Sequence, residues 1–225
     1  MRPALQSEPF DIDEAFRRLR VAVADLPKAA MFDLRDRGFG SPFEQLVGSL
    51  ISARTRDETT MEVCLRLFAE AKTPAEFVAL GEARLIALLH GASFPEPKAR
   101  DLLAIARSLV DDHGGEVPDT FEGLTAFRGV GPKIANLTLA VGFGRPALAV
   151  DVHVHRVANR WGYVAASTPE RTLAALLLVL PERYWIEINE RLVPFGKAIC
   201  TGVAPRCATC LLASLCAKVG VTSSR

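Results

Sequence analysis

The chain has 225 residues, which is enough for one large domain or two small ones. Its hydrophobic content of 49% and charged content of 24% exclude an intrinsically disordered chain, because such chains are poor in apolar residues. The longest apolar run, residues 173–180, is far shorter than the roughly 20 residues that a membrane-spanning helix needs. We therefore expect a folded protein that has no membrane partner.

The formal net charge is only +1, but the charge is unevenly distributed. Residues 191–225 contain five Lys and Arg residues and no Asp or Glu, so this segment carries +5 and the rest of the chain carries −4. Such a segment favours a polyanionic partner, although a solvated tail explains it equally well. The N-terminal sequence MRPALQSEPFDIDEAF has several acids and no apolar core of a signal peptide, so we expect a cytoplasmic protein, nucleoid-associated in a bacterium.

Several helix starts can be identified from capping signals. The sequences SPFE at 41–44 and TPAE at 73–76 combine a capping residue, a proline at the first helical position and a glutamate at the third. Related signals predict further starts at 55–58, 119–122 and 167–170. These closely spaced starts indicate a chain of helices joined by short connections.

The apolar spacing between these starts is helical. One predicted face ends before the glycines at 114 and 115, and it comprises Leu102, Ile105, Ala106, Leu109 and Val110. A second face comprises Met61, Cys64, Leu65 and Phe68. The sequence ALAVDVHVHRV at 147–157 is the one strand-like run, and it fits a turn into a helix equally well. We predict an all-α fold.

Four of the five cysteines lie within seventeen positions with the spacing C-x6-C-x2-C-x5-C; they are Cys200, Cys207, Cys210 and Cys216. The fifth, Cys64, lies on an apolar helix face, and we interpret it as a core residue. Four thiols this close in an intracellular chain indicate a metal site and not disulfides. A zinc ribbon usually has two C-x2-C pairs, whereas this segment has one, and it also suits a [4Fe–4S] cluster. The spacing leaves zinc and iron–sulfur open.

The stretch FRGVGPKIANLTLA at 127–140 is typical of a turn followed by a helix. Gly129 and Gly131 allow the backbone to approach a phosphate, and Pro132 suits the first helical position. Lys133 then falls in the first helical turn, where the helix dipole disfavours a cation by roughly 0.3–1 kcal/mol at an exposed site. A simple helix–helix turn would give no reason for this lysine, so its position indicates a function.

Three motifs together resemble the endonuclease III branch of the helix-hairpin-helix DNA glycosylases. FRGVGPK at 127–133 resembles the hairpin, AVDVHVHRV at 149–157 resembles the segment with the essential aspartate, and the cysteine spacing matches the iron–sulfur loop. The motifs occur in the order and at the separations of that family, and the similarity runs from about residue 41 to residue 216.

The resemblance implies a two-lobed, all-α DNA glycosylase fold. A helical barrel with the helix-hairpin-helix would span residues 35–145, and an iron–sulfur cluster domain would combine residues 1–34 and 146–225. The cofactor would be a [4Fe–4S] cluster held by Cys200, Cys207, Cys210 and Cys216. The partner would be double-stranded DNA with a damaged base or an abasic site, bound by a monomer in the cleft between the lobes.

The resemblance also implies the chemistry. Lys133 would attack the anomeric carbon of a flipped nucleotide and form a Schiff base, and the strand would break by β-elimination. Asp151 would assist, although a helix N-cap explains this residue as well. Such an enzyme is a bifunctional glycosylase and lyase acting on oxidised pyrimidines. The alternatives are a monofunctional enzyme of the adenine-removing branch, which typically lacks the lysine, and a non-catalytic DNA-binding iron–sulfur module.

Further DNA-binding residues follow from the resemblance. Gly129, Val130 and Gly131 form the hairpin turn, and Arg128 stands where the family usually has proline. Arg54, in ISARTRD, stands where the family usually has a glutamine that helps to fill the gap left by the flipped nucleotide. The partner loop GASFPEP at 91–97 is about two residues longer than usual. Ordinary loop variation would also explain these last two departures.

Overall fold

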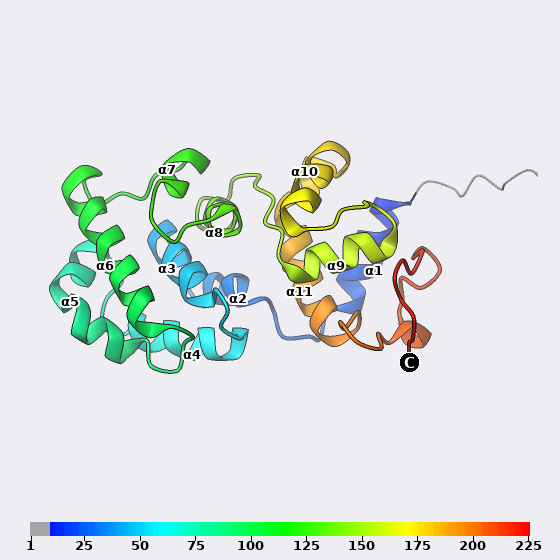
Figure 1. Ribbon diagram of the computed structural model, residues 1–225, viewed down its shortest axis with the longest axis horizontal. Helices are drawn as coiled ribbons and strands as arrows, with labels where there is room; N and C mark the ends of the chain where they lie inside the picture. Colours follow the sequence, from blue (N-terminus) through cyan, green and yellow to red (C-terminus); the bar gives the residue numbers. More distant parts are fainter. Residues whose placement is uncertain (1–9) are drawn as a thin grey trace, which may run out of the picture. The chain divides into compact units, whose positions relative to one another are not determined.

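The computed structural model describes residues 10–225, and this part of the chain is helical without any β-strand, as expected (Figure 1). The described chain forms two compact units, one of residues 28–149 and one that joins residues 10–27 to residues 150–225. The N-terminal sequence that predicts no signal peptide lies mostly in residues 1–9, outside the described residues. Within the described part, no helix is long and apolar enough to cross a membrane.

The unit of residues 28–149 is built around helix α3, because nearly every side chain of this helix is buried. In chain order its elements are α2 (Ala30–Asp36), α3 (Pro42–Ser52), α4 (Asp57–Phe68), α5 (Pro74–Leu88), α6 (Pro95–Asp112), α7 (Phe121–Thr125), α8 (Pro132–Leu137) and a π-helical turn (Thr138–Gly142). α5 and α6 lie side by side at one edge of the unit (Figure 1). The π-helical turn packs on α3, which fixes α8 to the centre of the unit.

The two strongest capping signals are confirmed. The hydroxyl of Ser41 accepts the N–H of Glu44, while the Glu44 carboxylate accepts the N–H of Ser41 at 3.0 Å. Thr73 and Glu76 form the same reciprocal pair at the start of α5. These boxes satisfy N–H groups that the first helical turn leaves without an intrahelical partner.

The weaker signals give helix starts within the predicted ranges, but the capping residue differs from the first residue of each signal. α4 begins at Asp57 without a side-chain cap, because the hydroxyl of Thr55 accepts the N–H of Ser93 instead. α7 begins at Phe121 and is capped by Thr120, since Asp119 pairs with Arg145. The start predicted at 167–170 is confirmed, with Thr168 as the cap of α10.

The predicted apolar faces are partly right. On α6, Leu102, Ile105, Ala106 and Leu109 are buried, but Val110 is 38% exposed because it lies 100° further round the helix than Leu109. On α4, Cys64 and Phe68 are buried as predicted, whereas Met61 and Leu65 are half-buried at the edge of the face. The true face of α4 comprises Thr60, Val63, Cys64, Leu67 and Phe68. Cys64 is therefore a core residue, and burial raises the pKa of its thiol to about 12.

The second unit consists of α1 (Ile12–Ala22), α9 (Val152–Trp161), α10 (Pro169–Val179) and α11 (Trp185–Ala198), with short 3₁₀ turns at Glu182–Tyr184 and Cys207–Thr209. α11 packs against both α9 and α1. The ring of Phe16 on α1 stacks on that of Tyr184 with centroids 3.9 Å apart. Both contacts hold the N-terminal helix to the C-terminal part of the chain.

The strand-like run at 147–157 is a turn into a helix. Residues 147–150 are buried and have no regular secondary structure, and α9 begins at Val152 after the cap residue Asp151. The alternation of polar and apolar residues reflects one face of α9, on which Val154, Val157, Ala158 and Trp161 are buried.

Candidate functional site

The hairpin between α7 and α8 is a tight turn whose conformation requires one glycine. Gly129 has φ +83°, a region that residues with a side chain rarely adopt, and a Cβ there would lie 3.1 Å from a carboxylate oxygen of Asp101. Gly131 has an ordinary extended conformation, and a Cβ there would meet no atom within 4 Å. The side chain of Val130 is buried and anchors the turn. The backbone around Gly131 thus faces open space.

The start of α8 is the uncapped helix N-terminus that the sequence predicts. Pro132 takes the first helical position, and the cap residue Gly131 has no side chain to bind the N–H groups that follow. At the starts of α3 and α5, in contrast, the hydroxyls of Ser41 and Thr73 accept hydrogen bonds from backbone N–H groups of the first turn. Unfilled N–H groups at a helix start, together with the dipole, favour an anion such as phosphate.

Lys133 lies in this first turn and is half-buried. No hydrogen bond or ion pair from the rest of the described chain engages its ammonium group. The structure therefore leaves the Lys133 amine available to a ligand.

α8 is fixed from both sides. The amide of Asn136 donates to the carbonyl oxygen of Leu148 at 2.9 Å, which ties α8 to the segment that leads into Asp151. On the other side, a Cβ at Gly142 would lie 2.9 Å from the Cα of Pro42, so the π-helical turn touches the backbone of α3. These contacts hold the helix that carries Lys133 in one orientation.

Asp151 is a helix N-cap, as one interpretation of the sequence predicts. Its Oδ1 accepts the N–H groups of His153 and Val154, both at 2.9 Å. Its Oδ2 accepts no hydrogen bond from the described residues. The carboxylate is therefore fixed through one oxygen while the other remains available.

The polar side chains after Asp151 stabilise the fold. Arg156 donates to the carbonyl oxygen of Cys200 at 3.1 Å and to that of Gly196 at 2.8 Å, and it contacts the ring of His153. Arg160 donates to the carbonyl oxygen of Thr201 at 2.6 Å. Together the two arginines hold the C-terminal end of α11 and the loop that follows it against α9.

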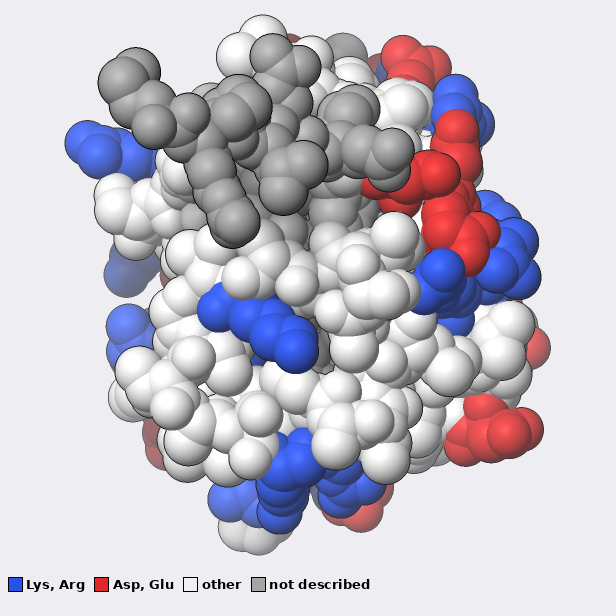
Figure 2. Space-filling model, turned by 90° about the vertical axis from the view of Figure 1, so that its right-hand side faces the viewer, with Lys and Arg blue, Asp and Glu red and all other residues white. Residues whose placement is uncertain are grey.

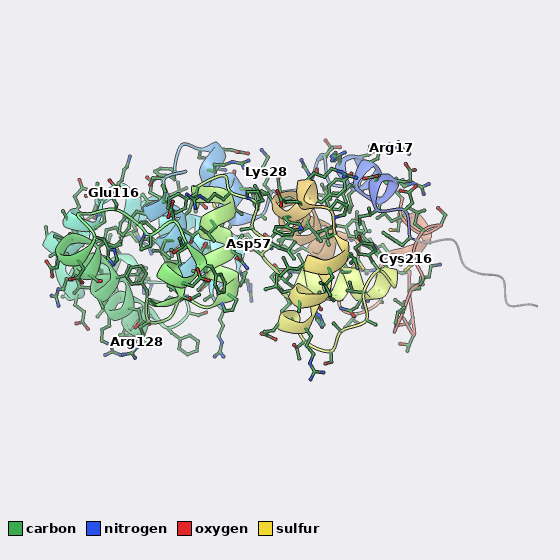
Figure 3. The ribbon with its side chains drawn as sticks, turned by 90° about the horizontal axis from the view of Figure 1, so that it is seen from above. Arg17, Lys28, Asp57, Glu116, Arg128 and Cys216 are labelled. Carbon is green, nitrogen blue, oxygen red and sulfur yellow. The ribbon has the colours of Figure 1, made fainter. Side chains whose placement is uncertain are left out.

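The four clustered cysteines line one pocket. Trp161, Phe195, Arg160 and Arg206 line it too, so its wall combines sulfur, apolar surface and positive charge. The Sγ of Cys200 accepts a hydrogen bond from Arg160 at 3.4 Å, and the Sγ of Cys216 accepts the N–H of Lys218 at 3.3 Å. Cys216 lies next to α9 (Figure 3).

Burial raises the pKa of both Cys210 and Cys216, and the neighbouring cysteines raise it further. Four thiolates can share such a pocket only when a bound cation compensates their charge. In the described part of the chain, no three His, Cys, Asp or Glu side chains are assembled as a site for a metal ion. The residues thus fit a sulfur-bound group in their chemistry, and the loop is the part that must close around it.

The outer face of the second unit carries few charges around this loop. Figure 2 shows a broad uncharged area with one Lys or Arg side chain near its middle, further Lys and Arg side chains at its lower edge, and Lys, Arg, Asp and Glu side by side along the right-hand border. Three residues of the C-terminal segment, Val203, Leu211 and Val219, expose between 48% and 86% of their surface. The face in view therefore does not show one continuous basic patch, although residues 191–225 carry five Lys and Arg residues and no Asp or Glu.

Arg54 and Arg128 are both exposed residues of the first unit. Arg54 follows α3 with φ 58°, and its guanidinium lies 5.9 Å from the centre of the Phe94 ring. Arg128 is 87% exposed, at the surface in Figure 3, and is ion-paired with Asp101. The sequence did not single out Phe94 or Asp101, because the left-handed conformation of Phe94 and the approach of Asp101 to Gly129 depend on tertiary packing.

Comparison with known proteins decides the family. Residues 47–182 match the HhH-GPD superfamily of base excision DNA repair proteins. Endonuclease III of Thermotoga maritima is 43% identical over 175 residues, covering 78% of this chain and 82% of the relative. The chain belongs to the endonuclease III family. Endonuclease III of Escherichia coli K12 is 34% identical over 178 residues, covering 79% of this chain and 84% of the relative.

Solved structures of the endonuclease III family have the same fold. A structure described as a trapped endonuclease III–DNA covalent intermediate has a TM-score of 0.80 and 29% identity, and it covers 92% of this chain and 94% of its own. A non-covalent endonuclease III–DNA complex matches with the same TM-score at 28% identity. The similarity extends over both units of this chain.

Proposed function

We propose that this member of the endonuclease III family removes oxidised pyrimidines from duplex DNA and cleaves the resulting abasic strand. The observation that carries the proposal is the unpaired amine of Lys133 in the first turn of α8, next to a hairpin turn with free backbone. A family member has been trapped as a covalent intermediate with DNA, which requires a nucleophile on the protein. Lys133 is the residue of this chain whose position suits that role.

The reaction needs a neutral amine. Lys133 Nζ attacks C1′ of the flipped nucleotide, and the bond between the sugar and the base breaks as the base leaves with its electron pair. The amine then loses a proton while the C1′–O4′ bond breaks and O4′ takes up a proton, which opens the sugar ring and leaves an imine. This imine makes the C2′ proton acidic, and removal of that proton expels the 3′ phosphate. The exclusion of water by bound DNA would favour the neutral amine in the complex, because removal from water disfavours the charged form.

Asp151 acts with the substrate bound. Its Oδ1 is held by the start of α9, so its Oδ2 can accept a proton or stabilise positive charge on the sugar while the base leaves. The capping role and the chemical role are compatible, because they use different oxygens of one carboxylate.

The hairpin would bind the DNA backbone. The backbone N–H groups of residues 129–131 and the start of α8 suit a phosphate, and such contacts position a duplex without reading its sequence. Arg128 would add a phosphate contact after it leaves Asp101. Arg54, exposed on a turn, would enter the duplex where the flipped nucleotide leaves a gap.

We also propose that Cys200, Cys207, Cys210 and Cys216 hold a [4Fe–4S] cluster, supported by their shared pocket and by hydrogen bonds to two of their sulfurs. The cluster would crosslink the C-terminal loop. The unit of residues 28–149 would then be the helical barrel, and the other unit the cluster domain. We expect a monomer that acts on chromosomal DNA, in the cytoplasm or nucleoid of a bacterium.

A panel of duplexes, each with one lesion, tests this function. Base release and strand cleavage are scored separately, and borohydride is added to trap an imine. We expect release of oxidised pyrimidines together with a trapped adduct. Base release without an adduct would favour the monofunctional alternative, and binding without either product would favour the non-catalytic module.

A further inference from the structure

Two left-handed residues face each other on the surface of the first unit. Arg54 has φ 58° and Phe94 has φ 57°, and neither is a glycine. Arg54 lies between α3 and α4, and Phe94 immediately precedes α6. Both side chains are exposed, with the guanidinium 5.9 Å from the ring centre. This conformation is unfavourable for a residue with a side chain, so surrounding contacts must hold both turns.

Lys98 supplies most of these contacts. Its side chain is 9% exposed, and its Nζ donates to the carbonyl oxygens of Ile51 and Ala53 at 2.6 and 2.8 Å. A third hydrogen bond joins Nζ to the hydroxyl of Thr55 at 3.0 Å. Because an ammonium group has three donors, all are used. Lys98 therefore binds Ala53 and Thr55, the residues on either side of Arg54, from the protein interior.

Ser93 connects the second turn to the first. Its hydroxyl donates to the carbonyl oxygen of Arg54 at 2.8 Å, and its N–H donates to the hydroxyl of Thr55 at 3.1 Å. The hydroxyl of Thr55 thus receives hydrogen bonds from Ser93 and from Lys98. The two turns form one hydrogen-bonded assembly, with Lys98 at its base and Arg54 and Phe94 at its surface.

Burying the charged ammonium group of a lysine without a carboxylate partner is energetically unfavourable. No carboxylate pairs with Lys98 among the described residues, and burial lowers its pKa to about 8. The nearest titratable group acting on it is the buried thiol of Cys64. The ammonium contacts two carbonyl groups at the end of α3, where the helix dipole favours a cation. A neutral side chain could accept or donate hydrogen bonds at the end of this helix without a buried charge. Helix capping alone therefore does not explain why a lysine holds the two turns.

We propose that Lys98 is a positioning residue for DNA distortion, which holds the Arg54 turn and the Phe94 loop as one rigid element that displaces the stacked bases. This inference rests on the proposed function, because it requires an enzyme that flips a nucleotide. Arg54 and Phe94 can both stack on bases, since a guanidinium plane and an aromatic ring each offer a flat face. Unstacking bases is energetically unfavourable, so a loosely held element would distort the duplex less efficiently.

The test compares Lys98→Met, which keeps the length but donates no hydrogen bond, with Gln45→Met as a matched control. Gln45 is also fully buried in this unit and donates to two carbonyl oxygens, those of Met31 and Phe39, away from both turns. Each protein is mixed with a duplex that carries one oxidised pyrimidine opposite 2-aminopurine, whose fluorescence rises when the base unstacks. Single-turnover base release is measured on the same duplex, well below both melting temperatures.

We expect Lys98→Met, which loses all three hydrogen bonds of the ammonium group, to lower the fluorescence rise and the base-release rate by about tenfold or more. On a duplex whose lesion is already unpaired in a bulge, the base-release rates of the wild-type protein and of Lys98→Met should differ less. Gln45→Met should lose comparable thermal stability and keep the wild-type fluorescence. If Lys98→Met fails to fold, Ser93→Ala should show a smaller loss in the same direction, because it removes one hydrogen bond at a half-buried position.

Wild-type fluorescence and base release in folded Lys98→Met, or in Ser93→Ala where that variant is needed, would overturn the inference. An equal loss on the bulged duplex, or an equal loss in Gln45→Met, would overturn it too, since either indicates general damage to the fold. Failure of the proposed function is distinguishable, because the wild-type protein itself would then give neither base release nor a borohydride-trapped adduct.

Discussion

The Nε of Arg128 lies 3.2 Å from Oδ1 of Asp101, so the cation next to the hairpin glycines is ion-paired within the protein. The other carboxylate oxygen of Asp101 is the atom that a Cβ at Gly129 would approach. This exposed pair is worth at most about 1 kcal/mol, but its carboxylate also repels any phosphate at the turn. DNA must therefore compete with Asp101 for Arg128.

Asp101→Asn should tighten binding to undamaged duplex about two- to fivefold, since it removes the competing charge and keeps the shape. Anisotropy titrations at two salt concentrations measure the change, which should shrink as salt rises. Asp112→Asn, on the same helix, is the control because it changes the net charge equally. An equal gain in both variants would assign the effect to net charge alone.

Lys133→Gln should abolish the borohydride-trapped adduct and reduce strand cleavage at least a thousandfold, because an amide cannot form an imine. Binding to undamaged duplex should change less than about fivefold, since the hairpin backbone remains. Gel analysis of trapped adducts checks this, with the exposed Lys72→Gln as a control for lost positive charge. A trapped adduct formed at the wild-type rate would mean that another amine is the nucleophile.

Asp151→Asn should lower base release about a hundredfold or more while the protein remains folded, because asparagine caps helices about as well as aspartate. Asp11→Asn is the matched control, since Asp11 caps α1 through the same kind of hydrogen bond. Melting temperature and single-turnover base release separate the two roles. If both variants lose stability equally and neither loses activity, Asp151 is only a cap.

Protein purified without oxygen should be brown, with broad absorption near about 400 nm, and removal of the metal should unfold the C-terminal loop. Limited proteolysis of the metal-free protein should cut first within residues 200–216. Colourless protein with one zinc per chain would show that the four cysteines bind zinc.

Acid should weaken the contact between α1 and α11. Burial raises the pKa of Glu187, but hydrogen bonds from Arg20 and Arg191 outweigh it and hold the pKa below its usual value. A lowered pKa in the folded state stabilises the protein above about pH 4.3, the unfolded value, and this stability is lost as pH falls through the folded value.

Glu187→Gln should therefore lower the melting temperature at pH 7 and reduce its dependence on pH between 5 and 3. Differential scanning calorimetry at several pH values measures both effects. Glu82→Gln, at an exposed position of α5, serves as the control and should follow the wild-type profile. A wild-type profile for Glu187→Gln would mean that its ion pairs add no stability.

Local sequence predicted the features that depend on neighbouring residues. The capping boxes at Ser41 and Thr73 are complete within four residues, so they are recognisable without a partner. Thr55 and Asp119 carry the same chemistry, but distant groups occupy their side chains, so neither caps the helix that begins after it. A sequence window cannot show such competition.

The candidate site also contains features that depend on neighbouring residues and features that depend on distant ones. The roles predicted for the hairpin, Lys133 and the cysteines depend on residues close together in sequence, and the structure gives the hairpin and the pocket a matching local geometry. The left-handed turns at Arg54 and Phe94 depend on Lys98, more than forty residues from Arg54 in sequence. Nothing in either turn alone predicts that they are joined.

Asp151 caps α9, which carries on its later turns Arg156 and Arg160, and these two side chains bind the backbone around Cys200. The ten residues of this helix span about 15 Å as one stiff rod. The helix that Asp151 caps is therefore the same helix whose arginines hold the backbone of the cysteine loop, so one stretch of regular structure carries contacts to both parts of the candidate site.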